Sequence, residues 1–287
     1  MMQPEQDGLT ADDHKRVAAF IERIAGIQLP EHKRSLVETR LRRRLRATGY
    51  PSIRAYLDFA FSSEGEAAEQ LLMLDALTTN KTDFFREPAH FAFLMQHVKN
   101  QLAPLKKTGW TRPLKVWCSA GSSGEEPYTL AMVLCELERQ LPGFHFTLWA
   151  TDIAPSALAT AKTAVYDHQR IAPVSEALRK RYLLRSKDPK KQLIRMAPEL
   201  RNRVEFDQFN LITGRYSDLP TFDVIFCRNV MIYFSPEDRD KVVRQLASRL
   251  VKEGLLFIGH SESLGSCRAY FEQLIPTVHS LKSRPAL

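Results

Sequence analysis

Apolar residues in the first part of the chain recur with the spacing of amphipathic helices. The first predicted helix carries these apolar side chains on one face: Val17, Phe20, Ile21 and Ile24. Gly26 ends that helix, and further helices are predicted at 31–47, 52–61 and 64–76. Because no strand-like alternation appears in this part, residues 1–78 are expected to form an all-α domain.

From residue 111 onward the pattern changes to short apolar runs separated by helical stretches. The runs are typical of strands buried on both faces, at 114–118, 146–151, 204–209, 222–227 and 255–259. Helices fit 125–140, 155–164 and 236–250. This alternation predicts an α/β fold with a mostly parallel, doubly wound sheet over 111–287. Two terminal runs, 271–275 and 278–282, predict a hairpin that carries an antiparallel strand.

Two segments interrupt this scheme. A linker at 79–110 contains polar residues, the adjacent Phe84 and Phe85, and a predicted helix near 88–103. Between 165 and 203 the strand–helix alternation stops, which indicates a small subdomain inserted into the sheet domain at about 180–205.

Composition places the chain among ordinary globular proteins. Of 287 residues, 44% are hydrophobic and 26% are charged, which argues against a disordered or fibrous chain. No uncharged stretch approaches the ~18 residues that a membrane helix needs, and the acidic N-terminus is unlike a secretory signal. Four widely spaced cysteines form no CxxC pair, so neither a zinc site nor a disulfide framework is indicated. We expect a reduced, cytoplasmic protein without a metal.

The net charge of +8 is concentrated in two segments. Residues 178–203 hold ten Lys and Arg against Asp188 and Glu199. In the helix at 31–47, a basic face opposite Leu41 contains Arg42, Arg43 and Arg46. Such a face is either simply solvated or docks on an anionic partner, and charge alone leaves both interpretations open.

In a doubly wound sheet, ligands bind at the carboxyl ends of the strands. The first strand is followed by a Gly/Ser turn at 119–124 and then by Glu125 and Glu126. Asp152, which ends the second strand, is suited to accepting hydrogen bonds from ribose hydroxyls, or would cap the next helix. Asn210 and Asn229 follow later strands and offer amides to an adenine edge or an amino-acid group, although either is also a common turn residue.

Together these strand ends predict a nucleoside pocket. Two carboxylates after the first strand disfavour a pyrophosphate, and a neutral-to-negative lining favours an adenosine with a cationic substituent. We therefore expect S-adenosylmethionine rather than NAD.

The sequence resembles a known family, the chemotaxis receptor methyltransferases (CheR). The resemblance covers nearly the whole chain and rests on LTTNKTDFFRE, WCSAGSSGEEPY, ATDI, FNL and FDVIFCRNVMIYF. It implies a helical N-terminal domain and a Rossmann-like methyltransferase domain with an inserted subdomain. It also implies methylation of glutamate side chains on bacterial chemoreceptors, with S-adenosylmethionine as the methyl donor and S-adenosylhomocysteine as the product.

By this resemblance the cofactor-binding positions are Asn80, Thr82, Arg86, Glu126, Asp152, Asn210, Leu211, Arg228 and Asn229. Arg86 would approach the methionyl end and the reaction centre, and Tyr233 would stand near the transferred methyl group. Arg42, Arg43 and Arg46 would face the helical bundle of the receptor.

The inserted subdomain corresponds to the part with which some family members bind a receptor tail. Its loop reads RSKDPKKQ and lacks the glycines that tail-binding members tend to have, which leaves this contact open. We expect a monomer that neither binds nucleic acid nor inserts into a membrane.

Three other functions compete with this interpretation. An RNA methyltransferase would share the cofactor pocket and place both basic segments on phosphates. A signalling module would bind the cofactor or a receptor without turnover, although Arg86 and Tyr233 argue against it. An NAD-dependent oxidoreductase is disfavoured by Glu125 and Glu126.

Overall fold

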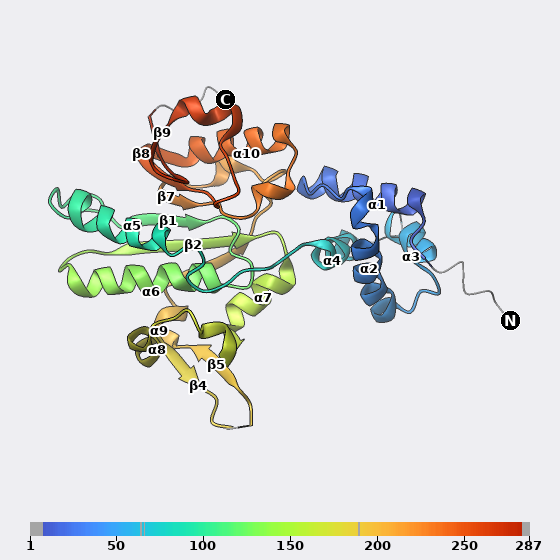
Figure 1. Ribbon diagram of the computed structural model, residues 1–287, viewed down its shortest axis with the longest axis horizontal. Helices are drawn as coiled ribbons and strands as arrows, with labels where there is room; N and C mark the ends of the chain where they lie inside the picture. The colour runs from blue at the N-terminus through green and yellow to red at the C-terminus, as the bar shows by residue number, and fades with distance from the viewer. Residues whose placement is uncertain (1–7, 64, 66, 189, 283–287) are drawn as a thin grey trace.

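The computed structural model describes residues 8–63, 65, 67–188 and 190–282 of the chain. The outermost residues of the expected domains, the first positions of the helix expected at 64–76, and residue 189 of the expected insertion lie outside these ranges. A helical domain stands at one side of a large sheet domain, and a small sheet projects from the latter (Figure 1).

The N-terminal domain is all-α, as predicted. Its elements are α1 (Ala11–Ala25), η2 (Glu31–Lys33), α2 (Arg34–Thr48), α3 (Ile53–Ala60) and α4 (Ala67–Leu77). Val17, Leu41 and Leu57 lie in one buried core that the helices share. Gly26 and Gly49 end α1 and α2 in the left-handed conformation, which a residue without Cβ adopts most easily.

The large domain is built on a seven-stranded sheet of order β6-β2-β1-β7-β8-β10-β9. Its strands are β1 (Leu114–Cys118), β2 (Phe146–Asp152), β6 (Val204–Gln208), β7 (Phe222–Phe226), β8 (Leu250–Phe257), β9 (Phe271–Ile275) and β10 (Val278–Leu281). Strands β6, β2, β1, β7 and β8 run parallel, and β10 pairs antiparallel with β8 and β9. The predicted parallel sheet and terminal antiparallel hairpin are both confirmed.

Helices cover both faces of this sheet. They are α5 (Ala89–His97) with its π-helical extension η3 (Val98–Leu102), α6 (Glu125–Gln140), α7 (Pro155–Thr163) and α10 (Pro236–Arg249). Val116 and Cys118 of β1 share a core with α5 and α6, whereas Trp117 between them packs in the core that contains α10. This alternation is why the strands read as uninterrupted apolar runs.

The expected strand at 255–259 begins earlier, since β8 starts at Leu250. The exposed, charged Lys252 and Glu253 interrupt the apolar pattern of the missed part, and the β7–β8 register shifts between Phe222 and Val224. Glu253 has a positive φ of 63°, which marks the irregularity. An irregular strand of this kind leaves no alternating pattern in the sequence.

A second sheet of order β3-β5-β4 makes up the small sheet: β3 (Val165–Asp167), β5 (Leu193–Met196) and β4 (Leu183–Arg185). Its helical turns are η4 (His168–Ile171), α8 (Glu176–Tyr182) and α9 (Pro198–Arg201). The expected range of 180–205 contains β4, β5 and α9, but β3 and η4 lie before it. The subdomain therefore begins at Val165, where the strand–helix alternation of the sequence stops, rather than near residue 180.

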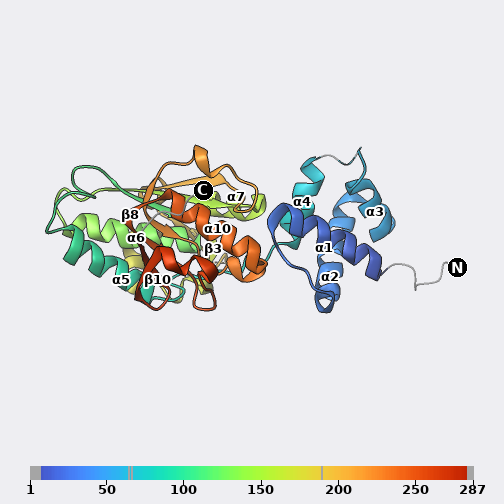
Figure 2. The same cartoon turned by 90° about the horizontal axis from the view of Figure 1, so that it is seen from above.

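The two domains meet through side-chain and backbone hydrogen bonds, a contact region that we call the domain seam. The Gln28 amide donates to the Tyr233 carbonyl (2.9 Å), and Asn210 Nδ2 donates to the Ile24 carbonyl (2.7 Å). Asp75 of α4 accepts from the Ser156 amide and hydroxyl at the start of α7. Figure 2 shows this arrangement from above, with the helical domain beside α7 and α10.

No helix in the described part of the chain is long and apolar enough to span a bilayer. The four cysteines are unpaired; Cys118, Cys227 and Cys267 are buried, and Cys135 is partly so. Burial raises the pKa of the Cys118 thiol well above its usual value.

Gly26 and Gly49 provide a matched pair for testing the packing at the domain seam. Both have positive φ (68° and 78°), but a Cβ on Gly26 would lie 2.6 Å from Ile212 Cδ1, whereas one on Gly49 meets nothing within 4 Å. Gly49→Ala is expected to lower the free energy of unfolding by about 1–2 kcal/mol through backbone strain alone. Gly26→Ala should cost at least ~1 kcal/mol more, because Ile212 must move. Denaturant unfolding measures both, and equal losses would show that the seam tolerates the methyl group.

Candidate functional site

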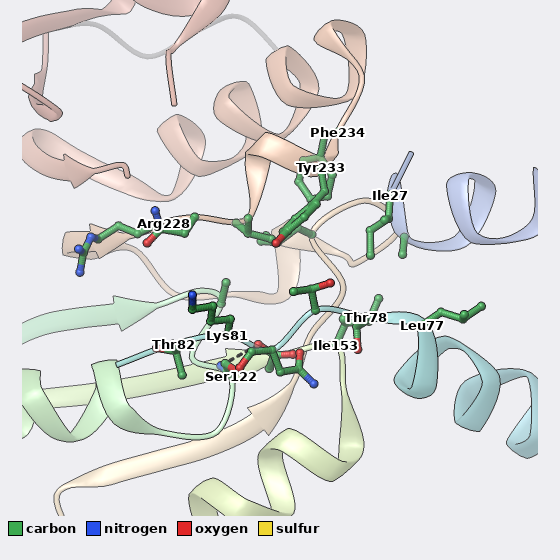
Figure 3. A pocket seen from close by; sticks show the side chains of 18 of the residues that line it. Ile27, Leu77, Thr78, Lys81, Thr82, Ser122, Ile153, Arg228, Tyr233 and Phe234 are labelled. Carbon is green, nitrogen blue, oxygen red and sulfur yellow. Dashed lines mark hydrogen bonds between the residues drawn. The ribbon is translucent and has the colours of Figure 1, made fainter. Parts of the chain in front are cut away.

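A pocket lies where the carboxyl ends of the strands, the linker and the helical domain meet. It encloses about 1050 Å³ including its open mouth. All ten residues expected to bind cofactor or to act in catalysis line it: Asn80, Thr82, Arg86, Glu126, Asp152, Asn210, Leu211, Arg228, Asn229 and Tyr233. Figure 3 shows Lys81 and Thr82 of the linker on one side of the cavity and Tyr233 and Phe234 on the other.

Asp152 is buried at the end of β2 with its carboxylate held by backbone donors. Oδ2 accepts from the Ser122 amide (2.7 Å) and Oδ1 from the Ala154 amide (2.9 Å). Burial raises the pKa of Asp152, and these backbone amides oppose that rise. Helix α7 has Ala154 as its N-cap with no side-chain cap, so Asp152 does not cap it. The carboxylate oxygens, which line the pocket, retain lone pairs for hydroxyl donors.

Arg228 forms the buried centre of an ion-pair network at the end of β7. Its Nη1 lies 2.5 Å from Glu126 Oε2, and its Nη2 lies 3.0 Å from Glu87 Oε2. Nη2 also donates to the Arg86 carbonyl (2.7 Å). Burial opposes the charge of Arg228, but the two carboxylates outweigh it and its pKa is raised. The network therefore ties the linker to both α6 and β7.

Glu262 holds the backbone that follows Arg228. Its two carboxylate oxygens accept from the amides of Asn229, Val230, Met231 and Gly259. Sequence reasoning missed this residue, because it lies 33 positions from Asn229 and belongs to no strand end that we inspected.

Four non-glycine residues around this pocket adopt positive φ. They are Phe85 (53°), Glu87 (57°), Ser122 (47°) and Asn229 (58°). Such conformations cost free energy and persist where the surrounding contacts hold them. Their clustering on both the linker and the strand ends is typical of a functional site.

Arg40 of α2, which the sequence placed only in a basic cluster, reaches the pocket. Its guanidinium donates to the carbonyls of Leu77 and Thr78 and to Thr79 Oγ1 (3.0 Å). Lys33 and Lys81 also line the pocket. The signal that would have identified Arg40 is its position one residue before Leu41 on the buried side of the helix, next to the linker.

The side chain of Asn210 is used differently from the expected adenine contact. Nδ2 donates to the Ile24 carbonyl across the domain seam, and Oδ1 accepts from the amides of Ile212 and Thr213. Asn210 thus serves as a turn residue and connects the two domains. Both Asn210 and the adjacent Leu211 line the pocket.

The expected neutral-to-negative lining is wrong. Two acidic residues, Glu126 and Asp152, line the pocket together with five basic ones: Lys33, Arg40, Lys81, Arg86 and Arg228. Most of these cations come from α2 and the linker, which an inspection of strand ends does not sample. Glu125 does not line the pocket; it is fully buried and pairs with Arg170 (2.7 Å).

Arg86 and Lys81 are the two cations that the linker contributes to the pocket lining. Arg86 lies beside Arg228, whose Nη2 binds the Arg86 carbonyl. It is partly exposed, and its Nη1 donates to the Lys81 carbonyl (3.2 Å). Tyr233, in η6 (Met231–Tyr233), is partly exposed, and Lys33 Nζ lies 6.0 Å from the centre of its ring. Both side chains are placed to meet a group that enters the pocket.

Arg42, Arg43 and Arg46 lie on α2 outside the pocket lining. Arg43 and Arg46 are exposed, and Arg42 is half-buried beside Glu38, whose Oε1 it binds at 2.9 Å. Val37 and Leu41, on the opposite face, are buried as the helical pattern predicted.

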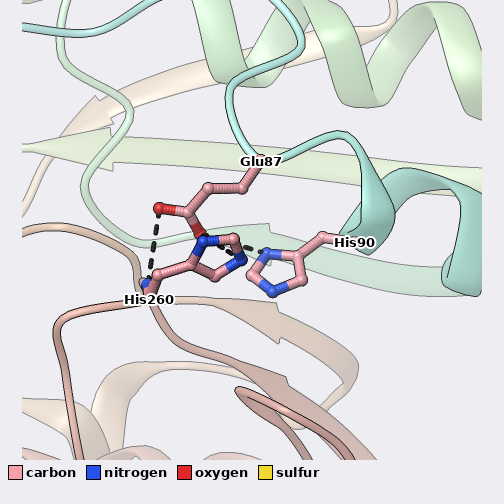
Figure 4. Close-up of side chains that lie close together, drawn as sticks. All are labelled: Glu87, His90 and His260. Atoms are coloured by element: carbon pink, nitrogen blue, oxygen red, sulfur yellow. Dashed lines mark hydrogen bonds and ion pairs between the residues drawn. The ribbon is translucent and has the colours of Figure 1, made fainter.

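Glu87, His90 and His260 form a polar cluster behind Arg228 (Figure 4). Their ligand-type atoms lie within 4.8 Å of one another. However, Arg228 already binds Glu87, so a cation there would have to displace a guanidinium. Thr277 Oγ1 lies 2.7 Å from His90 Nε2, so these two atoms share a hydrogen bond. The buried Nδ1 atom has no hydrogen-bond partner among the described residues.

Comparisons with known proteins agree with this geometry. The family patterns described as "CheR methyltransferase, all-alpha domain" and "CheR methyltransferase, SAM binding domain" match residues 12–78 and 80–279. The chemotaxis protein methyltransferase of Salmonella typhimurium is 36% identical, covering 100% of this chain and 96% of its own. That of Escherichia coli is 36% identical, covering 94% and 91%. Chemotaxis protein methyltransferase 2 of Pseudomonas aeruginosa is 37% identical, covering 94% and 93%.

The buried His90 makes the stability of the fold depend on pH. Burial, followed by the charge of Arg228, lowers its pKa from the usual ~6.5 to about 4. The neutral ring is favoured in the fold, so its contribution is complete above pH ~6.5 and declines as pH falls towards 4. Between pH 7 and 4.5 this residue should cost on the order of 2 kcal/mol of unfolding free energy.

Denaturant unfolding of His90→Gln should show a correspondingly shallower loss of stability over this range. His32→Gln, at an exposed position, serves as the control and should keep the wild-type slope. If His90→Gln and wild type lose stability in parallel, His90 does not titrate in this way.

Proposed function

Because the chain belongs to the CheR family of chemotaxis protein methyltransferases, we propose that the pocket at its domain seam is the site of methyl transfer to receptor glutamates. As a member of this family, the chain is an S-adenosylmethionine-dependent protein-glutamate methyltransferase that acts in chemotaxis. One observation carries the proposal about the site. Ten residues selected from strand ends and linker motifs, distant in sequence, line a single pocket.

We assign cofactor binding to the nine lining residues from Asn80 to Asn229 that the motifs identify. Asp152 would accept hydrogen bonds from the ribose hydroxyls, since its buried carboxylate is fixed by the Ser122 and Ala154 amides. The apolar side chains of Ile153 and Leu211 beside it fit a purine. Glu126 and Arg228, already paired, would shape the floor of the pocket without adding net charge.

S-adenosylmethionine supplies an activated methyl group on a sulfonium, which an incoming carboxylate displaces in line. A glutamate side chain has an ordinary pKa of ~4.3 and is ionised at neutral pH, so no general base is needed. The protein has to align the carboxylate and exclude water, and alignment alone is worth up to ~7–11 kcal/mol in favourable systems.

We assign this alignment to Arg86 and Tyr233. The excess of cationic groups in the lining supports the attraction of a carboxylate. We choose Arg86 among these cations because its partly exposed guanidinium donates to a backbone carbonyl, that of Lys81, and is not held by a carboxylate as Arg228 is. Tyr233 would fix its orientation from the opposite wall.

We further propose a division of labour along the chain. Residues 1–78 would dock the receptor, 79–110 would link the domains and close the active site, and 111–287 would bind the cofactor. The exposed Arg43 and Arg46, with Arg42 beside them, give the helical domain a basic surface for the cytoplasmic helical bundle of a chemoreceptor. We also propose that the protein is cytoplasmic, that it acts as a monomer, and that its substrate is not a nucleic acid.

The small sheet offers a second receptor contact. Its strand β4 lies at the sheet edge, and Leu184 and Leu193 are 50% and 39% exposed. An exposed edge strand can accept an extended peptide, and the neighbouring lysines would favour an acidic one. We propose that a receptor C-terminal tail binds there.

Asp152→Ala should weaken binding of S-adenosylhomocysteine by at least tenfold, because the ribose would lose its acceptor. Isothermal calorimetry measures this affinity without a receptor. Asp207→Ala is the control, since Asp207 lies in the adjacent strand β6 but outside the pocket lining. Equal affinity in the two variants would remove Asp152 from the cofactor site.

Arg86→Ala should reduce kcat for receptor methylation by two orders of magnitude or more, because the carboxylate would lose its guide. Steady-state assays with a purified chemoreceptor cytoplasmic fragment measure this. In the same assays, Arg43→Glu combined with Arg46→Glu should instead raise the KM for receptor and leave kcat near that of wild type.

Wild-type turnover in Arg86→Ala would exclude Arg86 from the alignment of the acceptor. An unchanged KM for the charge-reversal variant would likewise exclude the basic surface of α2 from docking. Nucleic acid that competes with the receptor in a salt-dependent manner would favour the RNA-directed alternative.

A further inference from the structure

Strand β3 and the turn η4 of the small sheet contact both walls of the proposed cofactor pocket. Arg170, in η4 directly after β3, donates from Nη2 to the Thr82 carbonyl of the linker (2.6 Å). The same atom lies 2.7 Å from Glu125 Oε1, at the start of α6. One guanidinium therefore bridges the linker and the helix that follows the Gly/Ser turn.

Tyr166 of β3 makes a parallel pair of contacts. Its hydroxyl donates to the Ser123 carbonyl (2.8 Å), and its ring meets that of Phe84 edge to face at 5.2 Å. A Cβ on Gly124 would lie 2.6 Å from the Tyr166 hydroxyl, so the turn packs directly on β3. The Gly/Ser turn and the linker are thus held against the same short strand.

The charge on Glu125 makes the Arg170 contact important. Glu125 has no exposed surface, and burial raises its pKa, against which its hydrogen bond from Ser123 Oγ (2.6 Å) and the charge of Arg170 act. Without Arg170 this buried carboxylate would keep hydrogen bonds from the Ser123 hydroxyl and its own backbone amide but would lose the guanidinium that balances its charge. Breaking one member of such a pair leaves an uncompensated charge that displaces its surroundings. Those surroundings are Ser122 and Glu126, which line the pocket.

Arg170 also completes the support of the linker backbone. Arg40 of the helical domain binds the carbonyls of Leu77 and Thr78, and Arg228 of the sheet binds that of Arg86. The carbonyl of Thr82, midway between them, is bound by Arg170. Each arginine comes from a different part of the fold, and the small sheet supplies the middle one.

We propose that Arg170 is a positioning residue for the cofactor, acting through Thr82 and Glu125, so that the small sheet supports the pocket in addition to any receptor contact. The inference rests on the proposed cofactor site. It predicts a defect in cofactor binding rather than in receptor binding.

Calorimetry with S-adenosylhomocysteine tests this on the full chain. Arg170→Ala should weaken binding at least tenfold, and Arg170→Lys should fall between it and wild type, because an ammonium keeps the charge but lacks the fixed planar geometry of the guanidinium. Adding Glu125→Gln to Arg170→Ala should recover part of the affinity, since no buried charge is then left unpaired. The control is Arg179→Ala, which removes a guanidinium that binds two carbonyls, Val174 and Ala172, within the same subdomain.

In methylation assays the KM for S-adenosylmethionine should rise at least tenfold in Arg170→Ala, with kcat at saturating cofactor and the KM for receptor within twofold of wild type. Cofactor affinity equal to that of Arg179→Ala would overturn the proposal, as would a fall in kcat with unchanged cofactor affinity. If Arg170→Ala does not fold, Arg170→Lys decides: wild-type affinity there overturns it. A wild-type protein that fails to bind S-adenosylhomocysteine would instead overturn the proposed cofactor site.

Discussion

A buried guanidinium at the end of β7 is the interaction on which the arrangement of the site depends. Arg228 brings together Glu126 of α6, Glu87 of the linker and the Arg86 carbonyl. Three charges and a carbonyl are withdrawn from water here, which is tolerated only because each has a partner. The linker is therefore fixed at the strand ends, because moving it away would leave buried charges without their partners.

This constraint explains why the two domains share one pocket. Fixed at Arg86 by Arg228 and at Leu77 and Thr78 by Arg40, the linker passes over the carboxyl ends of the strands and forms a wall. The helical domain adds Lys33 and Arg40 to the lining, whose two carboxylates, Glu126 and Asp152, come from the sheet domain. The cavity thus offers cations that suit an anionic acceptor and carboxylates that suit a cofactor with hydroxyl groups, as the proposed function requires.

The amino-acid sequence was sufficient for the architecture because the strands are buried on both faces and the helices are amphipathic. Strand-end reasoning also placed Asp152 and Asn229 at one pocket, because residues at parallel strand ends converge whatever the rest of the fold does. Arg228 came only from the family resemblance. The sequence failed where tertiary contacts decide. Glu125 looked like a pocket carboxylate but is neutralised by Arg170, 45 positions later in the chain.

Asn210 illustrates the same limit, since its amide is used to tie the turn to α1 across the domain seam. The sign of the pocket's charge was wrong for a related reason. Four of its five cations, Lys33, Arg40, Lys81 and Arg86, come from the helical domain and the linker, and no local pattern shows that these face the strand ends.

The central claim is that this pocket transfers a methyl group to a receptor carboxylate, and one measurement tests it most directly. Purified protein is mixed with a chemoreceptor cytoplasmic fragment and S-adenosylmethionine radiolabelled in its methyl group, and the labelled receptor is treated with mild alkali. The account predicts release of the label as volatile methanol, as a carboxyl methyl ester requires. Label that resists alkali, or no label on the receptor while the cofactor still binds, would contradict it.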